Sequence, residues 1–279
     1  MSIRELDILL LHAINGLAGQ SIFLDLAISK FALLNSFKTL PLIMCIVWLW
    51  FRQTSAGKQS RYRNGLACAL IGMFVALVFS RLCQNIMPQI PRPIHTPGLD
   101  IILPTGSDPN VLHGWSSFPS DHAAVAFAIA FGIARQSRPW GLFALAWAAF
   151  VICLPRIYIG YHYPSDIVMG ALIGIASVWI VARLIPEPLR ALSTLFEKPL
   201  GKPAFYAASF AMLFWITTMF NDIRQASSGL YEYVFDEKGE TMLAQASATR
   251  DPPVGGARPA RDTAALGDAP PVGESGPLH

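Results

Sequence analysis

The sequence predicts an all-α fold, a polytopic bundle of membrane helices, from three observations. Hydrophobic residues make up 53% of the 279 residues, charged residues only 14%, and the mean hydropathy is +0.44. A soluble domain usually has about 25% charged residues. The apolar residues are gathered in runs of roughly the length that a helix needs to cross a bilayer. We therefore expect an integral membrane protein with one main domain.

Seven apolar runs are the candidate spans, six for the core of the bundle and one extra at its C-terminal end. They cover residues 21–36, 38–52, 64–86, 120–135, 139–157, 164–186 and 203–220. The first two are short for a crossing, and Asp25 and Lys30 interrupt the first, so a re-entrant hairpin is the alternative. We favour two spans because the topology is then consistent.

Two polar segments flank the membrane domain, which we place at residues 21–190. Residues 1–20 are mixed in polarity and predict an interfacial helix; Glu5 and Asp7, with no small-residue cleavage site, argue against a removed signal peptide. A polar tail covers 221–279 and is rich in Ala, Pro and Gly from about residue 244. That composition predicts disorder, and we expect the tail to be dispensable for activity.

Basic residues gather in alternate connections, which the positive-inside rule places in the cytoplasm. The long connection from about 86 to 118 has Arg92 as its only Lys or Arg, so we expect it outside. The three basic groups are Arg52, Lys58, Arg61 and Arg63, then Arg135 and Arg138, then Arg183, Arg190, Lys198 and Lys202.

Charge and cysteine content argue against several other classes of function. The net charge is only +3 and no basic run follows the pattern of a nucleic-acid binder, so no nucleic-acid partner is expected. No CxxC or Cys/His spacing suggests a metal site, and neither a metal nor a cofactor is predicted. The four cysteines lie inside apolar runs and are expected to be buried; they are Cys45, Cys68, Cys83 and Cys153.

Three short polar clusters interrupt the apolar sequence, each at the outer end of a predicted span. They are Arg92-Pro93, then Pro119-Ser120-Asp121-His122, then Arg156 with His162 and Asp166. Pro119 and Pro164 suit the first turn of a helix, so two helix N-termini face the same side, and helix N-termini bind anions. Arginines can grip phosphate oxygens in bidentate fashion, and Ser120 adds a hydroxyl donor. A carboxylate four residues after a histidine can hold one ring nitrogen and leave the other to attack. The clusters therefore predict a site that cleaves a phosphate ester.

The spacing Arg156-x5-His162-x3-Asp166, preceded by Pro-Ser-Asp-His and Arg-Pro, resembles the type 2 phosphatidic acid phosphatase superfamily. The resemblance covers roughly residues 20–186 as an architecture. It implies a metal-independent enzyme with a phosphohistidine intermediate. By this resemblance His162 is the nucleophile, Asp166 orients it, and His122 is the general acid and later the base. Arg92, Arg156 and Ser120 would bind the phosphate.

The sequence departs from the usual family pattern at three positions. The family's lysine, seven residues before Arg92, is Asn85 here, and we expect Arg81, one helical turn earlier, to supply the missing cation. The glycine of the second cluster is Asp121, an extra carboxylate that either shapes specificity or proton handling or points away. The usual serine before Arg156 is Pro155. We place Arg81, Asn85 and Asp121 with the phosphate-binding residues.

The predicted function is a lipid phosphatase of a bacterial inner membrane with its site facing the periplasm. Pro-Ser-Asp-His resembles the branch that acts on undecaprenyl pyrophosphate, which is therefore the favoured substrate. Phosphatidylglycerol phosphate, phosphatidic acid and lipid A phosphates come next, and the sequence names no protein partner. A lipid phosphotransferase and a non-catalytic membrane relative remain alternatives. Vanadate-dependent haloperoxidases share similar clusters but are soluble, and this chain is too apolar for that class.

Overall fold

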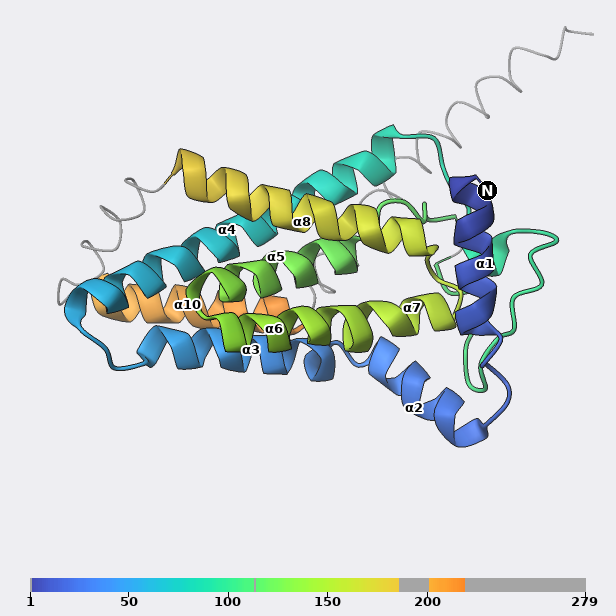
Figure 1. The fold of residues 1–279 in the computed structure, drawn as a ribbon, viewed down its shortest axis with the longest axis horizontal. Coiled ribbons are helices and arrows are strands. Elements are labelled where there is room, and N and C mark those ends of the chain that lie inside the picture. The colour runs from blue at the N-terminus through green and yellow to red at the C-terminus, as the bar shows by residue number, and fades with distance from the viewer. Residues whose placement is uncertain (1, 113, 186–200, 219–279) are drawn as a thin grey trace, which may run out of the picture. The chain divides into compact units, whose positions relative to one another are not determined.

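The computed structural model describes residues 2–112, 114–185 and 201–218, and these residues form helices and loops without a strand (Figure 1). The predicted all-α fold is thus confirmed for this part of the chain. The tail from 221 lies outside the described residues. The helices are α1 Ile3–Asn15, α2 Ile22–Leu33, α3 Asn35–Phe51, α4 Ala56–Ile86, η1 Pro93–His95, α5 Asp121–Gln136, α6 Arg138–Trp147, η2 Ala148–Cys153, α7 Leu154–Tyr158, α8 Pro164–Leu184 and α10 Gly201–Thr217.

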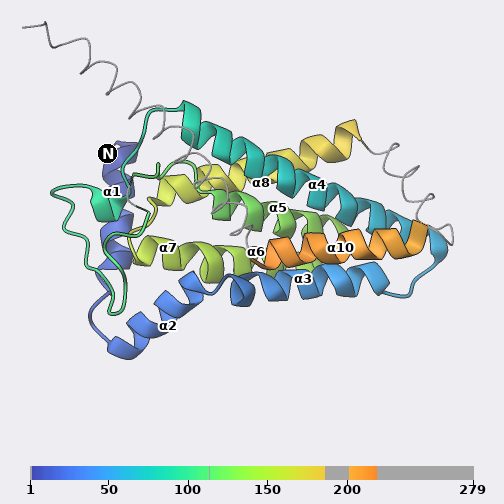
Figure 2. The same ribbon diagram turned by 180° about the vertical axis from the view of Figure 1, so that it is seen from behind.

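Helix α5 lies at the centre of the bundle and packs against α4, α6 and α8, as both ribbon views show (Figures 1 and 2). Its alanines are buried along most of its length, so the neighbouring helices can approach closely. On α8, a Cβ atom at Gly170 would lie 2.3 Å from the carbonyl oxygen of Ser120. A Cβ at Gly174 would lie 2.2 Å from that of Ala124. These two glycines therefore let α5 and α8 lie almost in backbone contact.

The helix from α6 to α7 is continuous but changes to a π-helix over η2, directly before Pro155. Because proline has no N–H to donate, it interrupts the regular hydrogen-bond ladder, and a wider turn is one way to absorb the interruption. The π-helix thus ends at Cys153, and Pro155 lies in the first turn of the α7 helix that carries Arg156.

Three helical stretches of the described residues are long and apolar enough to cross a membrane: Gly57–Ile86, Arg138–Tyr158 and Pro164–Leu184. The pair α2–α3 adds a fourth if it counts as one span. Its helices meet at Leu34 with a bend of 62°, whereas two successive crossings would need a reversal. This geometry is that of a broken span or a re-entrant segment, so it does not support the two-span interpretation of 21–36 and 38–52. The total number of crossings stays a prediction.

The buried charged side chains of α2 and α3, on either side of this bend, are hydrogen-bonded to other parts of the chain. The ammonium of Lys38, fully buried, donates to the carbonyl of Ala32 at 2.5 Å, in the last turn of α2. At the start of α2, the carboxylate of Asp25 accepts from the N–H groups of Gly19 and Thr105 and from the hydroxyl of Tyr158. Buried charges are tolerated when they are paired in this way.

Helix α1 lies across the ends of α7 and α8 (Figures 1 and 2), as expected for an interfacial helix. Asp7 accepts from the backbone N–H of Ser165 at 2.8 Å, which satisfies a free donor in the first turn of α8. Asn15 bonds both ways with the backbone of Ile102 and donates to the carbonyl of Tyr158. Helix α1 therefore ties the long connection after α4 to the end of the bundle that carries the polar clusters.

Candidate active site

The three polar clusters meet at one end of the bundle, although they lie far apart in the sequence. The N–H of Ile94, beside Arg92, donates to the carbonyl of Gly160 at 3.0 Å. The N–H of Ser120 donates to the carbonyl of Asp166 at 3.1 Å, which fastens the start of α5 to the start of α8. Gly160 has φ +80°, a left-handed conformation that glycine adopts readily. This turn reverses the chain between Arg156 and His162.

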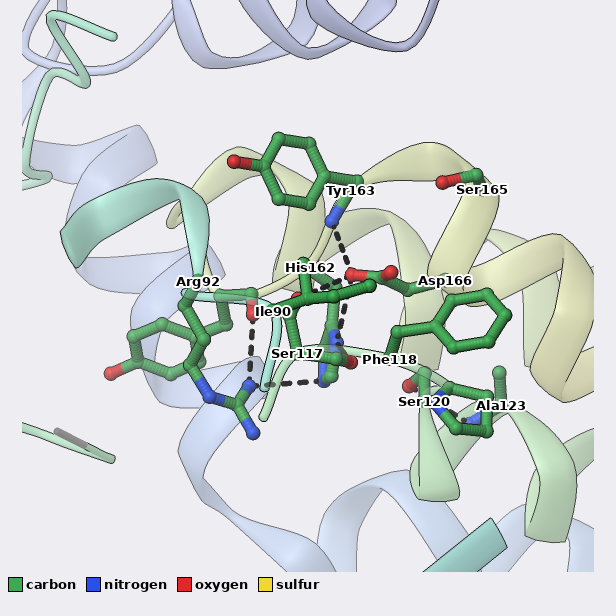
Figure 3. A network of polar contacts seen from close by, with 12 residues as sticks. Ile90, Arg92, Ser117, Phe118, Ser120, Ala123, His162, Tyr163, Ser165 and Asp166 are labelled. Atoms are coloured by element: carbon green, nitrogen blue, oxygen red, sulfur yellow. Dashed lines mark hydrogen bonds and ion pairs between the residues drawn. The ribbon is translucent and has the colours of Figure 1, made fainter. Parts of the chain in front are cut away.

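The ring of His162 is held in one tautomer by its two neighbours (Figure 3). Its Nδ1 lies 2.9 Å from the carbonyl oxygen of Ser117, which can only accept, so Nδ1 carries the proton. Its Nε2 lies 3.3 Å from Nη1 of Arg92, which can only donate, so Nε2 presents a lone pair. Burial lowers the pKa of His162, with Asp166 opposing the shift. The side chain is 1% exposed and is a neutral imidazole with its basic nitrogen beside a guanidinium.

Asp166 lies near His162 but makes its closest hydrogen bonds to other groups. Its Oδ2 lies 3.5 Å from Nδ1 of His162, while the same oxygen accepts from the N–H of Tyr163 at 2.8 Å and from the hydroxyl of Ser117. The carboxylate therefore fixes the loop and Ser117 by hydrogen bonds and acts on His162 through its charge. Ser117 contacts both members of the pair.

The two arginines of the motif are buried at the same end of the bundle. Arg92 donates through Nη1 to the carbonyl of Tyr161 at 2.8 Å and through Nη2 to that of Ser116 at 3.3 Å, and its Nε has no partner. Burial lowers the pKa of the Arg92 guanidinium, and the charges of Asp121 and Asp166 oppose that effect. The carbonyl of Arg156 accepts from the N–H groups of Tyr161 and His162. The segment that carries the nucleophile candidate thus begins at a buried arginine.

The second cluster forms the start of α5. Ser120 is buried, and its hydroxyl accepts from the N–H of Ala123 at 3.4 Å as a helix cap. Nδ1 of His122 lies 2.8 Å from Oδ1 of Asp121, and Oδ2 of Asp121 lies 2.8 Å from Nη2 of Arg81 on α4. Asp121 therefore does not point away from the site but is paired on both oxygens.

Gln84, and not Asn85, is the residue at this point of α4 that contacts the start of α5. Asn85 is exposed, whereas Gln84 is buried, donates to the carbonyl of Pro119 at 2.7 Å and accepts from Arg81 at 3.2 Å. The placement of Asn85 among the phosphate-binding residues is thus not supported by its position. Two residues that the motifs did not reveal, Gln84 and Ser117, contact the starts of α5 and α8.

No group of three or more His, Cys, Asp or Glu side chains is arranged to hold a metal ion within 2–112, 114–185 and 201–218. The charged side chains that do meet at this end are the arginines 81, 92 and 156 and the aspartates 121 and 166. Such a set can bind and neutralise an anion.

A family model described as the PAP2 superfamily matches residues 66–190, from α4 to the end of α8 and through all three polar clusters. The chain belongs to this superfamily. Undecaprenyl-diphosphatase BcrC of Bacillus subtilis is 29% identical over 163 residues, 58% of this chain and 74% of that protein. Decaprenylphosphoryl-5-phosphoribose phosphatase of Mycobacterium tuberculosis is 32% identical over 130 residues, 47% of this chain and 67% of that protein. The match to the putative undecaprenyl-diphosphatase YbjG of Escherichia coli covers less of the relative, and this chain spans 60% of the length of that protein.

Among solved structures, the crystal structure of Aquifex aeolicus LpxE is similar, with a TM-score of 0.48 and 28% identity. The match covers 66% of this PAP2 chain and 99% of that one.

Proposed function

We propose that this PAP2 protein is a membrane lipid phosphatase that hydrolyses a phosphate or pyrophosphate monoester through a phosphohistidine at His162. The observation that carries the proposal is the fixed tautomer of His162, with Nδ1–H on the carbonyl of Ser117 and the Nε2 lone pair beside Arg92. A buried, neutral imidazole whose unprotonated Nε2 accepts from a phosphate-binding arginine can attack phosphorus once a bound phosphate takes over that guanidinium.

In the first step, Nε2 of His162 attacks phosphorus, and the bond from phosphorus to the leaving oxygen breaks. The leaving oxygen takes the electron pair and receives the proton of His122. Arg92 and Arg156 stabilise the charge on the transferring phosphoryl group, and the first turns of α5 and α8 add backbone N–H groups. The carboxylate of Asp166 stabilises the positive charge that develops on the ring of His162.

In the second step, water attacks the phosphohistidine. His122, now neutral, takes a proton from the water, and the electron pair of the P–N bond returns to Nε2 of His162. Phosphate leaves, and both histidines recover their starting protonation states. In this scheme every charge is balanced by side chains of the chain itself, so the reaction is proposed to need no metal ion or other cofactor.

Undecaprenyl pyrophosphate is the favoured substrate. The relatives carry names of enzymes that act on polyprenyl-linked phosphates or diphosphates, and Pro119-Ser120-Asp121-His122 resembles that branch. A membrane-embedded chain with its site at the end of the bundle suits a substrate whose lipid tail stays in the bilayer.

We propose a bacterial inner membrane location with the site facing the periplasm. The basic residues of the α3–α4 and α5–α6 connections lie at the helix ends opposite the site, because α4 runs toward the site and α5 runs away from it (Figure 1). Positive residues favour the cytoplasmic side, which supports a site that faces outward.

The test is phosphate release by purified protein in detergent with EDTA present, measured on lipid diphosphates and lipid monophosphates, with His162→Ala as the paired variant. Release by the wild type that persists in EDTA and is lost in the variant supports the proposal. Loss of activity with EDTA that returns on adding a divalent ion would contradict the metal-free route. Transfer of the phosphoryl group to an added lipid, without free phosphate, would identify a phosphotransferase instead.

A further inference from the structure

We propose that Asp121, supported by Arg81, positions His122 for proton transfer to and from the substrate. Asp121 and Arg81 are then positioning residues of a reaction in which His122 is the acid and base. This inference rests on the proposed function and assigns a role to Asp121, which stands in place of the usual glycine, and to the arginine bonded to it.

The carboxylate of Asp121 has a partner on each of its oxygens. The side chain of Asp121 is 6% exposed, and a buried carboxylate is costly unless both oxygens have partners. Its Oδ1 lies 2.8 Å from Nδ1 of His122, and its Oδ2 lies 2.8 Å from Nη2 of Arg81. An ionised carboxylate can only accept, so Nδ1 of His122 carries a proton and Nε2 is the nitrogen that exchanges its proton with the substrate.

The side chain of Arg81 is itself held in place. It comes from α4, donates to Gln84 at 3.2 Å, and lies with Cζ 5.2 Å from the ring centre of Trp115. Gln84 in turn donates to the carbonyl of Pro119, directly before the start of α5. The guanidinium therefore bridges α4, the connection after it and α5, and it neutralises the carboxylate that the chain has in place of glycine.

The charges of Asp121 and Arg81 both act on a buried arginine of the site. The carboxylate of Asp121 and the guanidinium of Arg81 each act on Arg92, in opposite directions. As a pair they add little net charge near the phosphate, so Asp121 does not repel the substrate as an isolated carboxylate would. Arg81 thus compensates Asp121, which differs from the expectation that it simply replaces the family's lysine.

The chemical consequence concerns the protonated form of His122. The groups that face this end of α5 are Asp121 from α5 itself, Arg81 from α4, Arg92 from the connection after α4, and Arg156, His162 and Asp166 from the α7–α8 segment. Among these, Asp121 is the carboxylate bonded directly to His122. It favours the imidazolium that must protonate the leaving oxygen, while Arg81 moderates that effect.

The experiment is the pH dependence of kcat/KM for phosphate release in Asp121→Asn and Arg81→Met. In Asp121→Asn the alkaline limb, where His122 loses its proton, should move to lower pH by on the order of one unit. In Arg81→Met the carboxylate is no longer neutralised, so the alkaline limb should move to higher pH, and KM should rise. A purely structural role does not predict shifts of opposite sign.

Leaving-group chemistry gives a second readout. Asp121→Asn should lower kcat by roughly tenfold or more for a lipid monophosphate, whose leaving group is an alcohol, because general acid catalysis contributes about 10² to 10⁴. The loss should be smaller for a lipid diphosphate, whose leaving group is a phosphate. Asp108→Asn is the matched control, because Asp108 is an exposed carboxylate in the connection between α4 and α5.

The outcomes separate the two proposals. A wild type that releases no phosphate from any lipid contradicts the proposed function. An active wild type with superimposable pH profiles for Asp121→Asn, Arg81→Met and Asp108→Asn overturns the inference while leaving the function intact. Where a single variant unfolds, the double variant Asp121→Asn/Arg81→Met decides, because it lacks the carboxylate bonded to His122 and its alkaline limb should lie below that of the wild type. A double variant whose limb coincides with that of the wild type overturns the inference.

Discussion

The two histidines of the site are held in different ways. His162 has its Nδ1 on a backbone carbonyl, that of Ser117, and the nearest carboxylate oxygen lies 3.5 Å away. His122 has its Nδ1 directly on a carboxylate at 2.8 Å, and that carboxylate is bonded to a guanidinium. The same residue type is thus fixed by a neutral dipole in one place and by a charged pair in the other.

This difference matches the two tasks in the proposed reaction. A nucleophile must remain neutral until it attacks, and a backbone carbonyl sets its tautomer without favouring the charged form as strongly as a carboxylate would. An acid and base must change its protonation in every cycle, and a nearby carboxylate keeps the charged form accessible. We therefore expect His162 and His122 to respond differently to substitution.

The largest effect is expected for His162→Ala, which removes the attacking nitrogen. We expect a loss in kcat of about 10³-fold or more, because losing a nucleophile removes the whole covalent route. The measurement is phosphate release together with trapping of labelled phosphoenzyme, which should be acid-labile and base-stable as a phosphohistidine is. His95→Ala is the control, since His95 lies in the connection between α4 and α5 with Nε2 on the carbonyl of Val111. Detection of phosphoenzyme in His162→Ala would show that His162 is not the nucleophile.

A smaller loss, about 10²- to 10⁴-fold in kcat, is expected for His122→Ala. This variant keeps the nucleophile but has no base for the second step, so phosphoenzyme should accumulate on a lipid diphosphate. The measurement is the amount of trapped intermediate under conditions where the wild type shows little. If the two histidine variants behave alike, with neither accumulating intermediate, the proposed division of labour does not hold.

The sequence predicted most of the helices because length and hydropathy determine them. The specific spacing of His162, Asp166, Arg92 and Arg156 predicted that they lie at one end of the bundle, where the structure has them, and their roles stay predictions. It did not predict the bend at Leu34, since an apolar run carries no signal for direction.

Other parts of the site had weaker signals. Ser117 was missed because its main contribution to His162 comes from a backbone carbonyl, which any residue has. Asn85 was chosen by counting back from Arg92 through residues 87–91, which are not helical, so the count does not fix a face of α4. On a helix one residue is a rotation of about 100°, and the residue that turns toward α5 is Gln84.

A moderate effect is expected for Gly170→Ala, which tests whether both histidine networks depend on the α5–α8 contact. The new methyl group would lie 2.3 Å from the carbonyl of Ser120, so α5 must shift and its hydrogen bond to Asp166 must lengthen. Overpacking of this kind costs about 1–3 kcal/mol of stability. The measurements are the unfolding temperature in detergent and kcat. Gly57→Ala is the control, because nothing lies within 4 Å of a Cβ there. Equal behaviour of the two variants would show that the close approach is unimportant.

The smallest effect is a shift in the acid limb of kcat/KM, which reports the free enzyme. Because burial lowers the pKa of His162, the nucleophile stays neutral to a pH below its ordinary value of 6.5, and this limb should lie below 6.5. The substrate's own phosphate titrates in the same range, near about pH 6, so the limb alone is ambiguous.

The variant Asp166→Asn distinguishes the two groups. Asp166 raises the pKa of His162, so its removal should lower that pKa further and move the limb to lower pH. A limb that the substitution leaves in place belongs to the substrate, and one above pH 6.5 in the wild type would show that the charge of Asp166 outweighs burial.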